Sequence, residues 1–442
     1  MSKITLRTVF WFWLPLALSM LLMTIEGPWV QAVIGRKADP TLQLAAFGIV
    51  MSLSFTIEAP IIMLLATSSA LSRHKQALSV LSRFMWILNA LLTVLAMLMA
   101  FTPLLDAYLG RIIGLSQDII DAARPAMVIM IPWSAFIAYR RFYQGIMIRS
   151  GNSRAVGAGT IIRIAVSGGV AILLGLLSHL PGAVIGGWAL VSAVGAEAVY
   201  ARYAARHNVH ALRAMEPTPA SPLLSMREVM AFHMPLALTS VMTWLVRPMI
   251  ESGLANSPNP KAVLAAFPVA YSVGLLLRAG GLASQEVVLA LGKGEAQMRT
   301  LYRFIWWVAG GSMIISLLLG FTPLLNVYMT MLLSVPIEIQ PLVRLGVRAL
   351  MLFPLFVGLQ SYYRATLMLA GRTSAIYQGM IIGFVSTGLS LWLALRGQME
   401  PITAASFAMT MGLVVELGSL WWAQRGVVVD LQKRWQAAAV GD

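Results

Sequence analysis

The residues that could do chemistry in this chain are a few ionisable side chains inside long apolar segments. The carboxylates are Glu26, Glu58, Glu197, Glu251, Glu286 and Glu416, and the guanidinium groups belong to Arg140, Arg141, Arg163, Arg247, Arg278 and Arg364. A charge at the centre of a membrane-spanning helix costs at least about 2.5–3.5 kcal/mol on insertion scales. Each of these residues therefore needs an ion partner, a water-filled cavity or a function.

Catalytic chemistry is poorly represented. The chain has no cysteine and no G-x-x-x-x-G-K-[ST] phosphate loop, which excludes thiol nucleophiles, thiolate metal sites and an ATPase carried by this chain. No constellation of catalytic side chains is recognisable. We expect no enzyme activity and no cofactor beyond a coupling H⁺ or Na⁺.

The elements that position these charges are membrane helices. Hydrophobic residues make up 59% of the 442 residues and charged residues 11%, with a mean hydropathy of +0.79, whereas soluble domains carry about 25% charged residues. A membrane span needs roughly 20 apolar residues. The expected spans are 9–35, 42–71, 83–105, 118–149, 154–178, 182–205, 228–254, 262–292, 302–328, 338–370, 374–396 and 401–425.

The distribution of Lys and Arg predicts the orientation of these spans. Most basic loop residues fall on the side of the N-terminus, and Arg73, Lys75, Arg202 and Arg206 are examples. The positive-inside rule then places both termini in the cytoplasm. The net charge of +15 is explained in this way without a nucleic-acid partner. We expect an integral protein of the bacterial inner (plasma) membrane that works as a monomer in the lipid bilayer.

The chain repeats itself at one offset of 220 residues. Pro15 falls on Pro235, and Phe101-Thr102-Pro103-Leu104-Leu105 is identical to 321–325. Gly151 falls on Gly371, and near the C-terminus the offset becomes 219, where Glu197 meets Glu416. Each half holds an even number of spans, so the repeat is parallel. Transporters use such repeats to form a site between two lobes that rock around it.

The repeat divides the chain into four parts. They are a six-helix lobe at 1–206, a cytoplasmic linker at 207–227, a second six-helix lobe at 228–426 and a short cytoplasmic tail at 427–442.

The repeat also pairs unlike charges. Glu58 and Arg278 occupy equivalent positions, and Glu26 aligns with the residue before Arg247. One interpretation is a structural ion pair across the lobes, Glu58 with Arg278 or Glu26 with Arg247. The other divides the work: the acids bind H⁺ or Na⁺, and the arginines bind an anion through their planar fork. Both remain open. In either case we predict that Glu58 and Arg278 face one central cavity.

We predict substrate contacts and ion coupling at different residues. The predicted substrate-binding residues are Arg278, Arg247, Arg364, Gln144 and Tyr363, and the predicted coupling or gating residues are Glu58 and Glu26.

Weaker candidates have simpler structural interpretations. Glu251 lies four residues after Arg247 and favours an intrahelical pair. Glu197 and Glu416 could partner basic loop residues. Arg140, Arg141 and Arg364 could extend to the membrane interface. Glu286, on the span 262–292, is a further intramembrane charge.

Local motifs carry a family resemblance. The stretches LAAFGIVMSLSFTIEAP (44–60), PLALTSVMTWLVRPMIE (235–251), AAFPVAYSVGLLLR (265–278) and LFPLFVGLQSYYRATLMLAGRTSA (352–375) resemble the progressive ankylosis family. That family is a branch of the multidrug/oligosaccharidyl-lipid/polysaccharide exporter superfamily, which includes the multidrug and toxic compound extrusion (MATE) transporters. The resemblance covers about residues 10–425. It implies a MATE-like fold and export of small anions such as pyrophosphate, nucleotides or citrate.

Four functions remain in competition. The sequence favours a secondary active transporter that exports small organic or phosphate anions by alternating access. The first alternative is a proton- or Na⁺-coupled exporter of cationic drugs, for which Glu26, Glu58, Trp133 and Tyr139 would serve. A lipid-linked saccharide flippase would require cationic residues in both lobes. A membrane scaffold would transport nothing.

Overall fold

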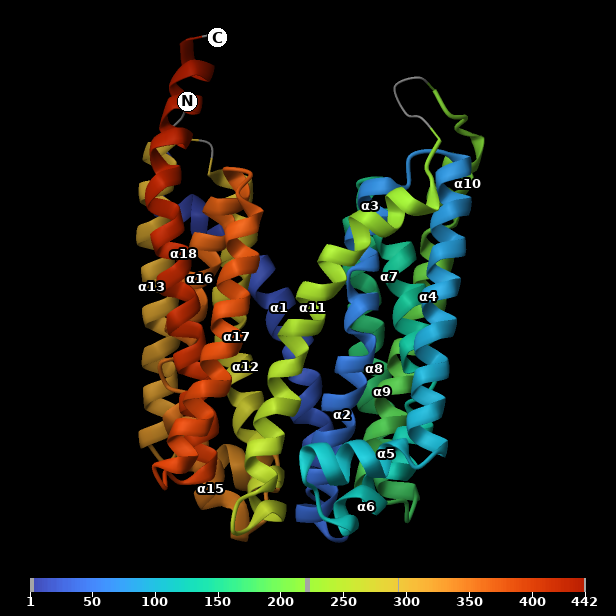
Figure 1. Cartoon of the computed structure of the whole chain (residues 1–442), viewed down its shortest axis with the longest axis vertical. Coiled ribbons are helices and arrows are strands. Elements are labelled where there is room, and N and C mark those ends of the chain that lie inside the picture. The colour runs from blue at the N-terminus through green and yellow to red at the C-terminus, as the bar shows by residue number, and fades with distance from the viewer. Residues whose placement is uncertain (1–3, 219–222, 293, 441–442) are drawn as a thin grey trace. The chain divides into compact units, whose positions relative to one another are not determined.

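A computed structural model describes residues 4–218, 223–292 and 294–440, which form helices joined by short connections (Figure 1). No β-strand occurs in these ranges. Eleven helices are long and apolar enough to cross a membrane, and a bent pair, Gln117–Ile129 with Trp133–Arg149, makes a twelfth span if its two helices are counted together. The predicted all-helical protein with about twelve spans is confirmed.

The spans match the predicted segments, except at the starts of two helices. The spans are α1 (Leu6–Ile34), α2 (Pro40–Ile62) with α3 (Leu64–Leu71), α4 (Lys75–Phe101), α6 (Gln117–Ile129) with α7 (Trp133–Arg149), α8 (Ser153–Leu177), α9 (Gly182–Ala204), α11 (Met226–Ala255), α12 (Pro260–Leu291), α13 (Glu295–Phe321), α15 (Gln340–Ala349) with α16 (Phe353–Leu369), α17 (Thr373–Arg396) and α18 (Pro401–Val440). Helices α4 and α13 begin eight and seven residues earlier than the predicted 83–105 and 302–328. The α6–α7 pair is bent by 45°, and Pro132 stands at the break, where proline cannot donate a helical hydrogen bond.

Short helices connect some of these spans. They are α5 (Leu104–Asp106), η1 (Ala107–Ile113), α10 (Arg206–Ala214), α14 (Leu324–Val327), η2 (Tyr328–Leu332) and η3 (Ile337–Ile339). The predicted linker 207–227 thus contains most of α10 and the start of α11, and its residues 219–222 lie outside the described part. The predicted tail from 427 continues α18 as far as Val440, and 441–442 are outside the described part.

Contacts divide the chain into two compact units, Met1–Pro28 with Ser257–Asp442 (unit 1) and Trp29–Asn256 (unit 2). Most of α1 therefore belongs to unit 1, and α11 belongs to unit 2, where it packs on α2. The sequence repeat marks which segments are homologous, whereas the units mark which segments pack together. The two divisions differ at the first helix of each repeat, because most of α1 packs in unit 1 and α11 packs in unit 2.

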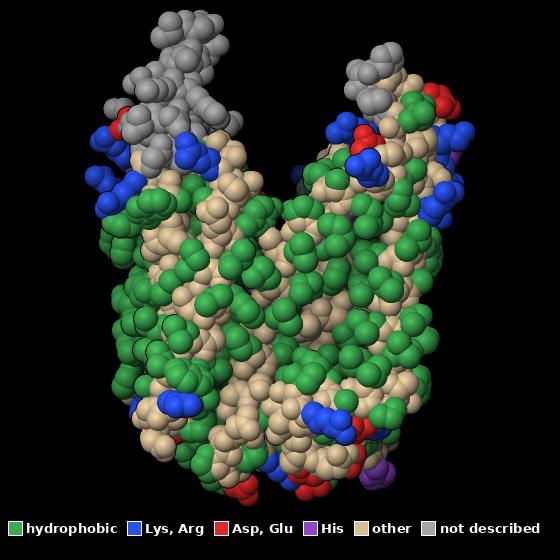
Figure 2. Space-filling view, viewed as in Figure 1, with side chains coloured by type: hydrophobic (Ala, Val, Ile, Leu, Met, Phe, Trp, Pro, Cys, Tyr) green, Lys and Arg blue, Asp and Glu red, His purple; other side chains and the backbone are tan. Residues whose placement is uncertain are grey.

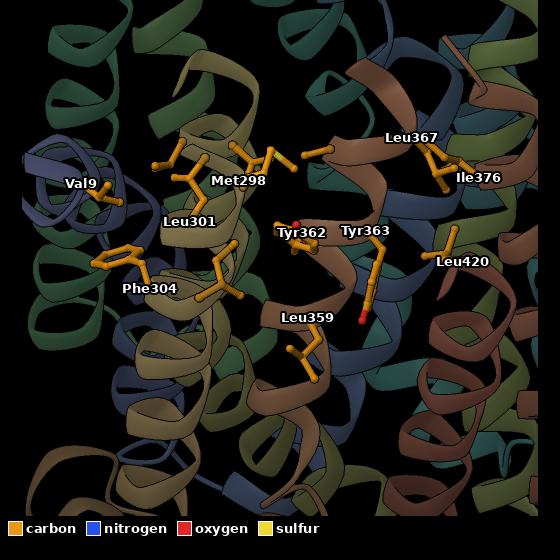
Figure 3. Close-up of a cluster of buried hydrophobic side chains, with 14 residues drawn as sticks. Val9, Met298, Leu301, Phe304, Leu359, Tyr362, Tyr363, Leu367, Ile376 and Leu420 are labelled. Carbon is orange, nitrogen blue, oxygen red and sulfur yellow. The ribbon is translucent and has the colours of Figure 1, made fainter. Parts of the chain in front are cut away.

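The core of unit 1 lies among α1, α12, α13 and α16. Phe304, Leu359 and Tyr362 belong to one buried cluster with Val9 of α1 (Figure 3). The indole of Trp13 donates a hydrogen bond to the carbonyl of Gly280 at 2.9 Å and meets the ring of Phe304 edge-on. These contacts hold the first part of α1 in unit 1.

Close helix packing in unit 2 depends on small residues. Gly145 of α7 lies against α3, where an added Cβ would come within 2.6 Å of the Leu65 carbonyl oxygen. At Gly186 of α9 an added Cβ would come within 2.6 Å of the Phe47 ring. Such sites let backbones approach closely in a membrane protein, where packing and hydrogen bonds replace the hydrophobic effect between helices.

The repeat is visible in local geometry. The hydroxyls of Thr102 and Thr322 each donate to a carbonyl four residues earlier at 2.6 Å. Gly151 and Gly371 both adopt positive φ, at 76° and 73°, a conformation that favours glycine after a helix. Equivalent loops therefore fold alike in the two halves.

Hydrophobic side chains cover the middle of the visible face of each unit, while Lys and Arg gather toward the helix ends (Figure 2). Exposed apolar residues such as Leu91 (64%) and Trp307 (75%) would be costly in water. This distribution is the one that a lipid bilayer requires.

Candidate functional site: buried charges within the spans

Four helices of unit 2 bring charged side chains together. Glu58 comes from α2, Arg140 and Arg141 from α7, Arg163 from α8, and Glu197 from α9. Helix α7 packs against α2, α8 and α9, and α8 packs along α9. We call these five residues the charge cluster of unit 2. Figure 1 shows their four helices within this unit.

Glu197 lies at the centre of the hydrogen bonds in this cluster. An Nη1 of Arg140 donates to its Oε2, the Nε2 of Gln144 donates to Oε1 at 3.0 Å, and the Nε of Arg163 is 3.8 Å from Oε2. Because Arg140 and Gln144 are four residues apart on α7, they lie on one helix face. The side chains of Glu197 and Arg140 are 1% and 5% exposed, so the pair is shielded from water.

A small residue makes room for Glu197. Gly159 of α8 faces it, and an added Cβ would lie 3.3 Å from the Glu197 Cγ. The glycine therefore allows α8 to approach α9 at the depth of the carboxylate.

Glu58 is buried in the same cluster but is less completely bonded. It is 2% exposed, and its Oε2 has no hydrogen-bond partner. Arg140, Arg141 and Arg163 act on it electrostatically. The Nε atoms of Arg140 and Arg141 are also buried without an acceptor. Buried polar groups are normally satisfied, so these atoms retain hydrogen-bonding capacity that the described residues do not use.

Aromatic side chains adjoin Glu58. Phe55, one turn earlier on α2, stacks on Trp244 of α11 at 4.4 Å between ring centroids and meets Trp133 of α7 at 6.3 Å. The Trp133 indole interacts with the Glu58 carboxyl group. The carboxylate thus has a cationic side and an aromatic side.

Unit 1 contains the equivalent of the Arg140–Glu197 pair. Arg364 of α16 bonds Glu416 of α18 through Nη2 and through Nε at 3.1 Å. Gly379 of α17, the repeat of Gly159, faces Glu416. The arginine position differs, because Arg364 is the repeat of Gln144 and Gln360 is the repeat of Arg140.

Two predictions for these residues were wrong. Glu197 and Glu416 bond arginines inside the spans, not basic loop residues. Arg140 is 4% exposed and bonds Glu197, so it does not extend to the interface. Long side chains reach outward only when no closer partner satisfies them, and here α9 and α18 supply that partner.

The predicted intrahelical pair on α11 is present. The Nε of Arg247 lies 3.1 Å from Glu251 Oε1, and its Nη2 donates to the carbonyl of Gly48 on α2 at 3.0 Å. Glu251 is 3% exposed. This pair fixes α11 on α2 within unit 2.

The other predicted residues lie in different surroundings. Arg278 of α12 has a buried Nε without an acceptor, and its guanidinium is 5.8 Å from the Phe353 ring. Tyr363 belongs to the buried cluster of unit 1. Glu26 is half-buried and Glu286 is exposed on its helix. The roles of all four in binding or coupling stay predictions, as does the cavity expected to contain Glu58 and Arg278.

No protein-family model and no curated protein matches the sequence. Solved structures match nearly the whole chain. One is described as the inward-facing conformation of a multidrug resistance MATE family transporter of the MOP superfamily, with 14% identity over 94% of this chain and 96% of that chain, and a TM-score of 0.72. The outward-facing conformation of a transporter described in the same words matches with 14% identity over 98% of both chains and a TM-score of 0.65.

A third match is a MOP superfamily transporter from Pyrococcus furiosus, with 14% identity over 96% of this chain and 97% of that chain, and a TM-score of 0.65. At such identities the comparison establishes the architecture. The chain has the MATE transporter fold. The finer resemblance to the progressive ankylosis family stays a prediction.

Sequence reasoning missed two features of this MATE fold. The first is the partner of Arg163, which is Glu197. Gly159, one turn before Arg163, and the repeat of Glu197 at Glu416 were the signals in the sequence that a carboxylate faces α8. The buried His233 of α11 was overlooked. Its Nδ1 is 2.9 Å from the Thr67 hydroxyl, and its Nε2 has no partner.

Proposed function

We propose that this chain is a secondary transporter that moves small anions across a membrane by alternating access, without enzymatic activity. The fold supports this proposal, because both an inward-facing and an outward-facing conformation are described for MATE transporters of similar structure. We further propose a bacterial inner membrane with both termini in the cytoplasm and function as a monomer. The preference for anions rests on the charges described above.

The observation that carries the anion proposal is the excess of arginine in the charge cluster of unit 2. Three guanidinium groups surround two carboxylates, so the cluster is cationic when both acids are ionised. Arginine binds phosphate and carboxylate through parallel hydrogen bonds. Arg140 and Arg163 already contact Glu197, whereas Arg141 and Arg278 have a buried Nε without an acceptor. Arg141 and Arg278 are therefore the best candidates for substrate contact.

Arg247 and Arg364, in contrast, are already bonded to carboxylates of their own units. They would bind substrate only by exchanging that partner, so we assign them a gating role in this proposal. Gln144 donates to Glu197 and would act by holding that carboxylate in place.

Glu58 is the candidate coupling residue. When ionised it competes with an anionic substrate for the surrounding arginines, and when it is protonated or holds Na⁺ this competition is removed. Substrate binding and cation binding are then thermodynamically linked. Coupling at Glu58 requires no other cofactor.

The Pyrococcus furiosus transporter of similar fold bears on the charge of the binding pocket. For that protein, a reversed polarity of the binding pocket is reported to suggest a different function. The MATE fold therefore accommodates pockets of different charge. In this chain we propose a pocket with cationic character.

A cationic drug is the alternative substrate. The aromatic group of Phe55, Trp133 and Trp244 beside Glu58 could attract a lipophilic cation through its ring faces. The multidrug resistance transporter of similar fold points the same way. The two proposals predict opposite ligand preferences.

A ligand-induced stabilisation assay separates them. The purified chain in detergent would be heated with citrate, pyrophosphate or ATP, and separately with a lipophilic drug cation. A ligand that binds only the folded state stabilises it by RT ln(1+[L]/Kd). The control variant is Arg111→Gln, which removes an exposed arginine outside the spans.

We expect stabilisation by at least one polyanion, lost in Arg141→Gln or Arg278→Gln and kept in Arg111→Gln. Stabilisation by the cation alone, lost in Glu58→Gln, would overturn the anion proposal in favour of drug export.

A further inference from the structure

A basic cavity of unit 2 is lined by none of the five charge-cluster residues, although it adjoins them on α7 and α9. Its volume is about 480 Å³, and it lies among α4, α7, α9 and α10. Lys75, Arg83, Arg202 and Arg213 line it without any acidic residue, together with Tyr143 and Trp86. Neither the transport proposal nor the repeat requires a cavity here.

The position of the cavity along α4 matches the boundary between water and lipid. Lys75 is the first residue of α4, and Arg83 lies eight residues further, about 12 Å deeper at 1.5 Å per residue. Arg202 and Arg213 stand in the last turns of α9 and α10. Figure 2 shows Lys and Arg gathered at this end of the unit.

An aromatic wall completes the cavity. Arg202 donates to the Tyr143 hydroxyl at 2.9 Å and lies 5.0 Å from the centre of its ring. Tyr139 connects Tyr143 to Trp86, with ring centroids 4.8 and 6.1 Å apart. Tyr and Trp are enriched at the headgroup level of membranes.

An exposed apolar stripe follows Arg83 on α4. Ile87, Leu91 and Val94 follow it on α4 at helical spacing, and their side chains are 58%, 64% and 52% exposed. Residues spaced by three and four share one helix face. A molecule with an anionic head in the cavity and apolar chains could therefore lie along this face.

The charge balance of the cavity favours an anion. Among the described residues, the acid that forms an ion pair with the cavity lining is Glu216, 4.0 Å from Lys75. Both side chains are largely exposed, at 74% and 63%. Such surface pairs contribute little, so Lys75 remains available. Basic pockets between membrane helices on the cytoplasmic side recognise lipid phosphate groups, and arginine forks bind phosphate oxygens.

We propose that this cavity is a binding site for the phosphate headgroup of an anionic phospholipid, whose acyl chains lie along α4 below Arg83. A free phosphate compound would satisfy the same basic residues, but it would leave the apolar stripe unused.

The test compares lipids on the purified full-length chain in detergent. Dioleoylphosphatidylglycerol, dioleoylphosphatidylcholine and soluble glycerol 3-phosphate are added separately, and the midpoint of thermal unfolding (Tm) is measured. The cavity variant is Arg83→Gln with Arg213→Gln. The control is Arg206→Gln with Arg227→Gln, which removes the same charge from exposed residues outside the cavity lining.

We expect phosphatidylglycerol to raise Tm by at least about 2 °C in the wild-type chain and the control but not in the cavity variant. Native mass spectrometry should show one fewer bound phosphatidylglycerol in the cavity variant. Equal stabilisation by phosphatidylcholine, equal stabilisation by glycerol 3-phosphate, or retention of the bound lipid in the cavity variant would each overturn the proposal.

Discussion

Arg140 of α7 bonds Glu197 of α9, and Arg364 of α16 bonds Glu416 of α18 in the homologous half. The two arginines differ in position by one helical turn. The two carboxylates are equivalent in the repeat, and each lies against a glycine of the neighbouring helix. The arginine has exchanged places with a glutamine four residues along the helix. Both halves thus contain the ion pair, with the cation one turn further along the helix in unit 1.

The exchange predicts a compensating double substitution. Arg140→Gln alone leaves Glu197 buried without its main partner, which typically costs about 3–5 kcal/mol and should strongly lower Tm. Adding Gln144→Arg reproduces the arrangement of unit 1, with glutamine first and arginine four residues later. We expect the double variant to recover much of the lost Tm in detergent.

The matched control for this experiment is Arg140→Gln with Gln144→Glu, which adds a second acid instead of a cation. If the Tm of the double variant Arg140→Gln with Gln144→Arg is no higher than that of this control, the two ion pairs are not equivalent.

Helix packing at Gly145 predicts a large difference between two glycine substitutions. An alanine Cβ at Gly145 would meet the Leu65 carbonyl oxygen at 2.6 Å, whereas at Gly157 of α8 nothing lies within 4 Å. Overpacking costs typically about 1–3 kcal/mol, while alanine in an open helical position gains up to about 1 kcal/mol over glycine. Thermal unfolding should show Gly145→Ala destabilised and Gly157→Ala unchanged or more stable. Equal effects would contradict the close approach of α7 and α3.

The pair between Asp106 of α5 and Arg124 of α6 predicts a local sensitivity to acid. Arg124 donates to both Asp106 oxygens at 2.6 and 2.7 Å and thereby holds the pKa of Asp106 below its usual value. A carboxylate with a lowered folded-state pKa stabilises the fold above its unfolded pKa, and this stabilisation is lost as pH falls through the folded pKa. The effect should therefore be confined to pH below about 4.

The second half supplies the comparison for this pH effect, because Arg344 bonds the uncharged Asn326 at the equivalent position. In Asp106→Asn the acid-dependent part of the Tm loss should decrease, and the Tm at neutral pH should fall slightly, by the small contribution of a partly exposed ion pair. An unchanged acid profile in Asp106→Asn would show that the pair is not coupled to folding.

Glu58→Gln predicts a change in the pH dependence of ligand binding. Glutamine imitates the protonated carboxyl group, so Arg140, Arg141 and Arg163 are no longer partly neutralised by Glu58. Anion affinity should rise at neutral pH and become less dependent on pH, whereas the wild-type chain should bind more tightly as pH falls. Calorimetric titration across pH 5–8 measures this. Identical pH profiles for the variant and the wild type would exclude Glu58 as the coupling residue.

The sequence predicted the spans well because hydrophobic length decides them. The segment 154–178, for example, corresponds to α8 at Ser153–Leu177. It also predicted the Arg247–Glu251 pair, since helical spacing brings those residues together without any tertiary contact. The repeat further indicated which loops would fold alike, as the pair Gly151 and Gly371 shows.

Contacts between helices distant in sequence were harder to predict. Arg140 bonds Glu197, and Arg163 lies 3.8 Å from it, only because α7, α8 and α9 pack at one depth, and Gly159 permits that approach. Hydropathy gives the length of a helix but not its rotation about its axis. The expectation that Arg140 reaches the interface was wrong for this reason.

The most direct test of anion transport is flux in proteoliposomes under an imposed membrane potential. Vesicles loaded with radiolabelled citrate or pyrophosphate would be given an inside-negative potential, which favours expulsion of each negative charge by about 2.3 kcal/mol per 100 mV. We expect anion efflux from vesicles that contain the wild-type chain or Arg111→Gln, and none from vesicles that contain Arg141→Gln. Absence of anion flux together with transport of a lipophilic drug cation through the same vesicles would contradict it.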